Sequence, residues 1–137
     1  MISAIRTARP SDIQSVLTLW IESDAEPTHT DDSKGLNMLL ANDPEALVVA
    51  EEGTDIVGSV IAAWDGWRGS IYRLVVSPSH RRQGVAARLL AHAETRLITV
   101  GAVRLQAIVV ETDPLAAGFW KATSWEQQVE RLRFVKG

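Results

Sequence analysis

The 137-residue chain has no cysteine, no long run of one charge, and no apolar stretch long enough to span a bilayer. The missing cysteine excludes disulfide bonds and a thiol nucleophile, and it suits a reducing cytoplasm. Acidic and basic residues are mixed along the chain and the net charge is −3, which argues against nucleic-acid binding. The amino end also lacks the basic-then-apolar order of a signal peptide. The composition therefore predicts a cytoplasmic protein that binds neither nucleic acid nor membrane.

Several catalytic motifs are also missing. The three histidines, His29, His80 and His92, lack the spacing of metal ligands, so we expect no metal site. There is no Gly-x-Ser-x-Gly segment, which disfavours a serine hydrolase. The Gly-x-Gly-x-x-Gly turn of dinucleotide-binding folds is absent as well. The reaction must therefore be inferred from what the sequence contains.

Apolar residues make up 46% of the chain, enough for one core, so we expect a single domain over residues 1–137. Periodicity and turn residues predict elements in the order β-α-α-β-β-β-α-β-α-β. The expected strands are residues 2–7, 46–51, 56–64, 70–76, 103–109 and 127–135. The expected helices follow Pro10, carry Leu36 to Leu40, run from Val85 to a stop at Gly101, and span 115–123. Ile21 and Ile98 are assigned to the buried stripes of the first and third helices.

The most informative segment runs from Leu74 to Leu90. It predicts a buried strand, a short turn, a basic Arg-x-x-Gly-x-Ala loop and a helix. This order places free backbone N–H groups and the positive end of a helix dipole at the carboxyl end of a strand, which favours a phosphate or pyrophosphate. Gly84 permits close backbone approach, and Arg81 and Arg82 add positive charge. The alternative is an ordinary strand-to-helix turn with solvated arginines.

With this element order, the chain resembles the GNAT superfamily of acetyl-CoA-dependent N-acetyltransferases. Residues 76–86, Val-Ser-Pro-Ser-His-Arg-Arg-Gln-Gly-Val-Ala, match the family's signature Val-x-Pro-x-x-(Arg/Gln)-x-x-Gly-x-(Gly/Ala). Residues 113–125 match a second motif more faintly, and residues 64–72 are similar to the small bacterial members of the YpeA type. The resemblance implies an α/β (α+β) fold whose mixed, twisted sheet splays open between its fourth and fifth strands.

The resemblance also implies roles for individual residues. Acetyl-CoA would lie in the opening of the sheet, and no metal would take part. Val76 would present its N–H to the thioester oxygen as an oxyanion donor. The positions implied for cofactor binding are Leu74, Val75, Val76, Arg81, Arg82, Gln83, Gly84, Val85, Ala86, Asp113, Phe119 and Trp120.

Two positions depart from the family pattern. Ser70 stands where many members carry a glutamate base, and Trp120 stands where a tyrosine commonly protonates the CoA sulfur. Tyr72, on the same strand face as Ser70, is a candidate catalytic residue whose phenol could orient a water or the substrate, although a phenol is a weak base. The chemistry therefore uses a base elsewhere, or relies on a water chain, or the domain binds CoA with little turnover. The alternative bases are Glu111 at the end of the fifth strand and Glu22, Asp24, Glu26 and His29 of the acidic connection.

Three further features carry two interpretations each. Asp113 is either the N-cap of the last helix or a pantetheine contact, although an ionised carboxylate can only accept hydrogen bonds. Trp64 and Trp67 either wall the acceptor site or cover a hairpin or dimer contact. The acidic residues 22–32 either attract an amine cation or form a solvated loop.

Two functions follow from these expectations. The first is an N-acetyltransferase, monomer or homodimer, that moves an acetyl group from acetyl-CoA to an amine of a small molecule, peptide or protein. The second is a CoA-binding sensor or interaction module on the same scaffold. The sequence does not identify the acceptor.

Overall fold

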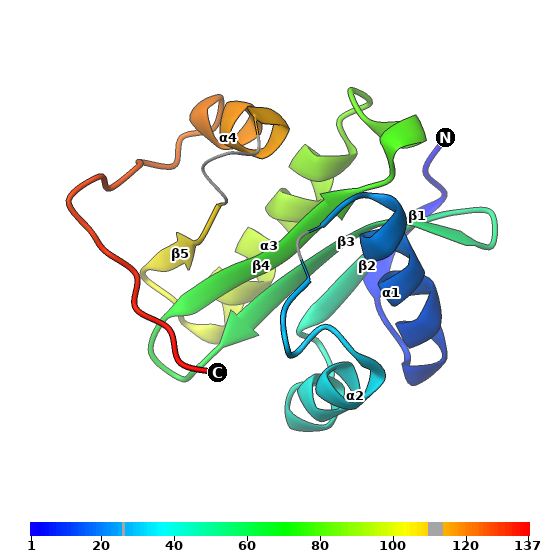
Figure 1. Cartoon of the computed structure of the whole chain (residues 1–137), viewed down its shortest axis with the longest axis horizontal. Coiled ribbons are helices and arrows are strands. Elements are labelled where there is room, and N and C mark those ends of the chain that lie inside the picture. Colours follow the sequence, from blue (N-terminus) through cyan, green and yellow to red (C-terminus); the bar gives the residue numbers. More distant parts are fainter. Residues whose placement is uncertain (26, 110–113) are drawn as a thin grey trace. The chain divides into compact units, whose positions relative to one another are not determined.

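The computed structural model describes residues 1–25, 27–109 and 114–137 (Figure 1). The chain divides into two compact units, Met1–Ala107 and Ile108–Gly137, and each is described by itself. Among the described residues, the first unit holds a five-stranded sheet and three α-helices, and the second holds one short helix and an irregular tail.

The sheet is a meander in which the strands lie in sequence order. Its strands are β1 (Ala4–Thr7), β2 (Leu47–Glu52), β3 (Asp55–Trp64), β4 (Gly69–Val76) and β5 (Leu105–Ala107). The first three pairings are antiparallel, and β4 pairs with β5 in parallel. Tight turns explain the antiparallel pairings of β2 with β3 and of β3 with β4, whereas β1 and β2 are joined through α1 and α2. The parallel pair needs the long helical connection between residues 76 and 105.

Helices cover both faces of the sheet. They are α1 (Ile13–Glu22), α2 (Ser33–Asn42) and α3 (Val85–Val100), with short 3₁₀ turns at Pro10–Asp12 and Pro78–His80. A Cβ at Gly58 would contact Leu89 of α3, whereas the next side chain, Ser59, contacts Trp20 of α1. Because successive strand residues point to opposite faces, α1 and α3 lie on opposite sides of the sheet.

The core follows the predicted apolar stripes with two exceptions. Val16 and Trp20 of α1 and Leu89 and Leu97 of α3 are buried. Ile21 and Ile98 are exposed, Ile98 by 62%, so their assignment to the core was wrong. Each follows a buried residue directly, and the 100° step to the next position turns its side chain away from the sheet. Gly101 ends α3 with a φ of 114°, as predicted for a helix-ending glycine.

The second unit contains α4 (Pro114–Lys121), where the sequence predicts a helix, and no strand among its described residues. The strand expected at residues 127–135 was therefore wrong. Strand alternation would place Val129 and Val135 with Arg131 and Arg133 on one face, and Leu132 and Phe134 on the other. Neither face is apolar, and Phe134 remains 89% exposed. Among the described helices of the whole chain, none is long and apolar enough to cross a membrane.

Candidate active site

One edge of β4 is unpaired over its second half. The ladder with β5 covers Gly69–Ile71 and ends at the pair Ile71–Ala107. From Tyr72 to Val76, β4 keeps its antiparallel partner β3 and pairs with no strand on the other side among the described residues. The sheet therefore opens beside β4, and main-chain groups at this edge are available to an extended ligand.

A β-bulge lies where this free edge begins. Ile61 pairs with Tyr72 and Ser59 pairs with Val75, so two residues of β4, Arg73 and Leu74, oppose one residue of β3. Arg73 has a φ of 51°, a left-handed conformation that is uncommon for a residue with a side chain. A bulge bends a strand and re-aims the residues that follow it. The bulge therefore sets the direction of the main chain at Leu74–Val76.

The main chain of Val76 points to the free edge. The N–H of the next residue, Ser77, donates to the carbonyl of Val57 on β3 at 2.8 Å. Because neighbouring residues direct their main-chain groups to opposite edges, the N–H and C=O of Val76 face away from β3. The Val76 carbonyl accepts there from Nε of Arg81 at 3.3 Å.

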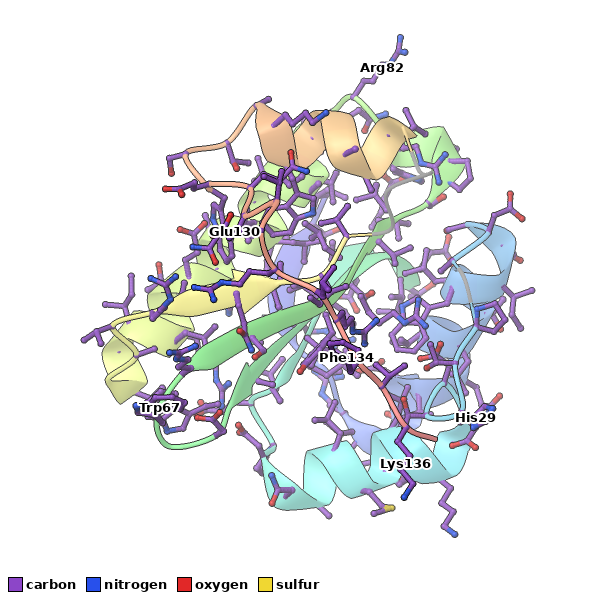
Figure 2. The ribbon with its side chains drawn as sticks, turned by 60° about the vertical axis from the view of Figure 1, so that its left-hand side comes forward. His29, Trp67, Arg82, Glu130, Phe134 and Lys136 are labelled. Atoms are coloured by element: carbon purple, nitrogen blue, oxygen red, sulfur yellow. The ribbon has the colours of Figure 1, made fainter. Side chains whose placement is uncertain are left out.

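The turn after β4 leads into the N-terminus of α3. Arg82 and Gly84 have φ values of 63° and 78°, and no side chain caps the first turn of the helix that starts at Val85. The first N–H groups of α3 have no carbonyl partner within the helix, because intrahelical bonds begin with Arg88 N–H to Gly84 C=O. Left-handed residues followed by free N–H groups form a concave site for an anion. Figure 2 shows Arg82 projecting away from the ribbon.

Arg81 makes hydrogen bonds within the protein in addition to the positive charge for which the sequence singled it out. Its guanidinium donates to the carbonyls of Val76 and of Ser23, the residue that ends α1 (3.3 and 3.5 Å). The side chain therefore joins the turn to β4 and to the C-terminus of α1. Arg82 is exposed as well, and its side chain projects away from the turn and adds positive charge there (Figure 2).

The turn is also attached to the β2–β3 hairpin. Nε2 of His80 lies 3.0 Å from Oε2 of Glu52, and the amino group of Met1 lies 2.9 Å from the same oxygen. The ammonium group, and then His80, lower the pKa of the Glu52 carboxyl. Gln83 donates back to the carbonyl of Ser79 at 3.4 Å and closes the turn on itself.

Ser70 and Tyr72 lie on the face of the sheet that α1 covers. A Cβ on their neighbour Gly69 would meet Leu97 of α3, so Ser70 and Tyr72 point to the other side. The Ser70 hydroxyl is buried and accepts from Nε2 of Gln106 on β5 at 3.1 Å. Tyr72 is 46% exposed and pairs with Ile61 across the strands. Of the two side chains, Tyr72 is the one that solvent or a substrate can reach.

The acidic connection between α1 and α2 is only partly solvated. Asp31 pairs with the guanidinium of Arg73 and accepts from the N–H of Thr28 at 2.8 Å. Asp32 caps α2 by accepting from the N–H of Gly35 at 2.7 Å. Glu22 and Asp24 are exposed, so the charge open to solvent is smaller than the sequence suggests.

Comparison with known proteins identifies the fold that builds this edge and turn. Residues 12–123 match the model of the acetyltransferase (GNAT) family. The chain belongs to the GNAT family of acetyltransferases. An acetyltransferase of Pectobacterium atrosepticum is 34% identical over 122 residues, which cover 89% of this chain and 86% of that protein. One of Yersinia enterocolitica is 36% identical over 124 residues, which cover 90% of this chain and 88% of the relative.

Solved structures share the GNAT fold at low sequence identity. A predicted acetyltransferase of Clostridium acetobutylicum, solved with acetyl-CoA, has a TM-score of 0.76 at 19% identity and covers 98% of this chain and 96% of its own. The PaiA N-acetyltransferase of Thermoplasma acidophilum, solved with coenzyme A, has a TM-score of 0.76 at 14% identity, with 88% and 87% covered. The family and fold predicted from residues 76–86 and the element order are thereby confirmed.

Some residues assigned to the GNAT site by sequence belong to the second unit or fall outside the described residues. Glu26, Glu111 and Asp113 are outside the described residues, so their assignments stay predictions. Phe119 and Trp120 belong to the second unit, where their rings meet edge to face at 5.7 Å. No group of three or more potential metal ligands occurs in the part of the chain that the structure describes.

The two hairpin tryptophans differ in environment. Trp64 is half-buried at the end of β3, whereas Trp67 is 69% exposed (Figure 2). The guanidinium of Arg68 stacks 4.2 Å from the ring centre of Trp67. The turn is fixed by Asp65, which accepts from the N–H groups of Arg68 and Trp67; these bonds lower the pKa of its carboxyl. Trp67 therefore already stacks against a cation of its own chain.

Sequence reasoning missed four residues around the bulge. Arg73 has the left-handed conformation, and Ser59 donates a hydrogen bond to its carbonyl. Trp20 donates to Ser59 and its ring lies near the Arg73 guanidinium, while Gln106 donates to Ser70. The one signal in the sequence is Ser59, a lone hydroxyl inside the apolar run of β3, because a buried polar group needs a partner.

Proposed function

We propose that the protein is an N-acetyltransferase that transfers the acetyl group of acetyl-CoA to an amine. The observation that carries this proposal is the free edge of β4 that leads directly into the uncapped turn at Arg81–Ala86. Acetyl-CoA has an extended pantetheine arm that leads to a diphosphate. The amides of the arm suit the open strand edge, and the diphosphate suits the turn that follows it. The solved GNAT neighbours with acetyl-CoA or coenzyme A support the same ligand.

Each part of the substrate has a corresponding part of the chain. The N–H groups from Arg81 to Ala86 hold the diphosphate, with Gly84 leaving room for it. The main chain of Leu74–Val76 pairs with the pantetheine amides. The Val76 N–H then donates to the thioester oxygen, where negative charge develops during attack. Asp113, Phe119 and Trp120 of the second motif remain proposed contacts of the pantetheine arm.

The reaction is a direct attack that needs no covalent enzyme intermediate. The amine nitrogen forms a bond to the thioester carbon, the carbonyl oxygen becomes an oxyanion, and the C–S bond then breaks. The nitrogen loses a proton to a base or a water, and the sulfur leaves as a thiolate, whose acid has an ordinary pKa only modestly above neutral. Orientation of the two reactants supplies much of the rate.

The proton acceptor is proposed to be Glu111, or a water held at Tyr72. Ser70 contributes no base, because its hydroxyl is buried and accepts from Gln106. The exposed phenol of Tyr72 lies on the face covered by α1, where it can hold a water. Exposed Glu22 and Asp24 would attract an amine cation to the same side.

A second candidate function is a CoA-binding module with little turnover. The observation that favours it is the pair of departures at Ser70 and Trp120, which leaves two proton-transfer positions without an acid or base. On this account the edge and turn still bind CoA, and the difference lies only in the chemistry. Cytoplasmic location and a monomeric or dimeric state are expected of both candidates.

Calorimetry and a thiol-release assay distinguish the two candidates. We expect acetyl-CoA to bind with micromolar affinity, and thiol release to accelerate with at least one member of a broad panel of primary amines, peptides and polyamines. Binding without turnover for any acceptor favours the binding module. No heat and no competition at millimolar acetyl-CoA rules out both.

A further inference from the structure

A buried hydrogen-bond chain supports the bulge of β4 from inside the protein. Nε1 of Trp20 donates to the hydroxyl of Ser59 at 2.8 Å, and that hydroxyl donates to the carbonyl of Arg73 at 2.9 Å. Ser59 is fully buried and Trp20 nearly so. The chain links α1, β3 and β4, and it ends on the residue with the left-handed conformation.

The Ser59 hydroxyl has no substitute in this place. It accepts one hydrogen bond and donates another, so it satisfies an indole N–H and a main-chain carbonyl together. In the structure, the Arg73 carbonyl accepts from this hydroxyl at the bulge, where the register of the ladder is interrupted. Without the hydroxyl, the buried indole N–H loses its acceptor and the half-buried Arg73 carbonyl loses this donor, which costs free energy that a shift of the bulge can relieve.

The side chain of Arg73 is fixed on the same side. Its guanidinium lies 5.4 Å from the ring centre of Trp20, and its Nε donates to Oδ1 of Asp31 at 3.2 Å. Trp20 therefore interacts with Arg73 in two ways. Its indole ring lies near the guanidinium, and its N–H bonds the Ser59 hydroxyl that in turn bonds the Arg73 carbonyl. Asp31 adds the loop between α1 and α2 to the same assembly. The backbone strain of a left-handed arginine persists only where surrounding contacts enforce it.

We propose that Trp20 and Ser59 are positioning residues that hold the β4 bulge, and through it the free edge Leu74–Val76, in the alignment that the thioester requires. The inference rests on the proposed function and deepens it. Only two residues separate Arg73 from Val76, so a small rotation at the bulge moves the N–H aimed at the oxyanion. Arg81–Ala86 lie beyond this edge and bind the diphosphate independently of the bulge.

The proposal predicts that variants of Ser59 and Trp20 lower kcat much more than they change the Kd for acetyl-CoA. Ser59→Ala lowers kcat about tenfold, since misplacement of a reacting group by a fraction of an ångström has effects of this order. The Kd for acetyl-CoA changes by no more than about twofold, because the diphosphate turn keeps its contribution and a small shift of Leu74–Val76 weakens the pantetheine pairing without removing it. Trp20→Phe keeps the ring under Arg73 and the Ser59–Arg73 bond, so kcat falls only about threefold. Because Trp20 acts through Ser59, the double variant is no worse than Ser59→Ala.

Ser23→Ala is the matched control. Ser23 is also a buried serine, and its Oγ has no hydrogen-bond partner among the described atoms of the chain. Removing that hydroxyl leaves nothing unpaired, so Ser23→Ala keeps the wild-type kcat. Both serines lose the same atom, and the comparison isolates the two hydrogen bonds of Ser59.

The experiment measures kcat, the Kd for acetyl-CoA and the amide NMR shifts of Leu74–Val76, at a temperature where every variant is folded by circular dichroism. The expected result is a lower kcat and displaced Leu74–Val76 amides in Ser59→Ala, with Kd and Ser23→Ala unchanged. Trp20→Phe shows the same pattern at smaller size and decides the question if Ser59→Ala fails to fold. Wild-type kcat and amide shifts in the folded Ser59 or Trp20 variants overturn the proposal.

Failure of the proposed function gives a different result. If the wild-type protein turns over no acceptor, the transferase proposal fails, and the amide shifts alone decide the inference. Leu74–Val76 amides displaced in Ser59→Ala but not in Ser23→Ala support it. Identical amide shifts in both variants overturn it.

Discussion

The two halves of β4 have the same backbone direction and opposite surroundings. Gly69–Ile71 are buried between β3 and β5, and a Cβ at Gly69 would come within 2.6 Å of Leu105 and 2.8 Å of Leu97. Tyr72–Val76 lie half-exposed beside an open edge, beyond a bulge and before a turn with two left-handed residues. One half of the strand is fixed by packing, and the other is fixed by specific hydrogen bonds that leave its edge free.

The difference indicates that the first half of β4 contributes mainly to stability and that the second half contributes mainly to ligand binding. Substitutions in the first half should change the free energy of unfolding, because they alter a close-packed interior. Substitutions that alter the open edge of the second half or the adjoining turn should change binding and turnover, because no described strand pairs with β4 on that side beyond Ile71. The following variants test this division.

Gly84→Glu should have the largest effect. Its side chain places a bulky anion where the diphosphate is proposed to bind, and we expect the affinity for acetyl-CoA to fall at least about 100-fold. Gly66→Glu is the control, since Gly66 also has a positive φ (89° against 78°) and open space around its Cβ position. Calorimetry should show binding lost in the first variant and kept in the second, with both folded. Unchanged affinity in Gly84→Glu would place the site elsewhere.

Val76→Pro tests the free edge itself. Proline removes the N–H that faces away from β3, so kcat should fall about 100-fold with a small loss of stability. Val75→Pro removes an N–H on the side that pairs with Ser59 and should mainly destabilise the fold. Thiol-release kinetics and urea unfolding separate the two effects. Equal kcat in Val76→Pro and wild type would show that this N–H has no part in turnover.

Gly69→Val tests the packed half. The added side chain meets Leu97 and Leu105, and overpacking of this kind costs about 1–3 kcal/mol of unfolding free energy. Acetyl-CoA affinity of the folded protein should stay within about twofold of wild type, because the diphosphate turn is distant along the strand. A variant with full stability and weak binding would reverse the proposed division.

Asp12→Asn tests a stabilising contact remote from β4. The Asp12 carboxylate accepts from Arg6 at 2.8 and 3.1 Å and from the N–H of Arg9 at 2.8 Å, and these bonds lower its pKa. A lowered folded-state pKa stabilises the protein above the unfolded value of about 3.9 and loses this effect as the pH falls through the folded value. The variant should be less stable at pH 7 by about 1–2 kcal/mol, with the difference shrinking below about pH 4.

Urea unfolding across this pH range measures the effect, and Asp55→Asn serves as the control because Asp55 is an exposed carboxylate at the start of β3. Acetyl-CoA binding should be unchanged in both variants. A stability difference between Asp12→Asn and wild type that persists undiminished at pH 3 would contradict the assignment.

Tyr72→Phe should have the smallest effect. The phenol lies on the acceptor side at the boundary of the two halves, and loss of one water-holding hydroxyl should lower kcat about threefold without changing the Kd for acetyl-CoA. Ser70→Ala should leave kcat unchanged, since that hydroxyl is already engaged by Gln106. A larger fall of kcat in Ser70→Ala than in Tyr72→Phe would show that proton transfer takes place in the packed half of β4.

The sequence predicted the meander, the helices and the strand–turn–helix junction, because these depend on local apolar spacing and on turn residues. It also placed the glycine turn at residue 84, where a positive φ is observed. Its errors have physical reasons. Ile21 and Ile98 extend an apolar pattern by one step beyond the face that the sheet can cover, and residues 127–135 distribute apolar side chains over both faces of the expected strand.

The contacts that fix the bulge could not be read from local pattern. Trp20 and Ser59 are 39 residues apart in sequence, and their hydrogen bond depends on how α1 crosses β3. Arg81 was assigned by its charge, yet its guanidinium joins the turn to the end of α1 through Ser23. Such long-range polar contacts become visible only when the elements are packed.

A crystal structure of the protein with acetyl-CoA tests the central claim most directly. We expect the diphosphate within about 3.2 Å of N–H groups between Arg81 and Ala86, the pantetheine beside Leu74–Val76, and the thioester oxygen facing the Val76 N–H. Acetyl-CoA bound away from this edge, or a β5 that pairs with β4 along its whole length and closes the opening, would contradict the account.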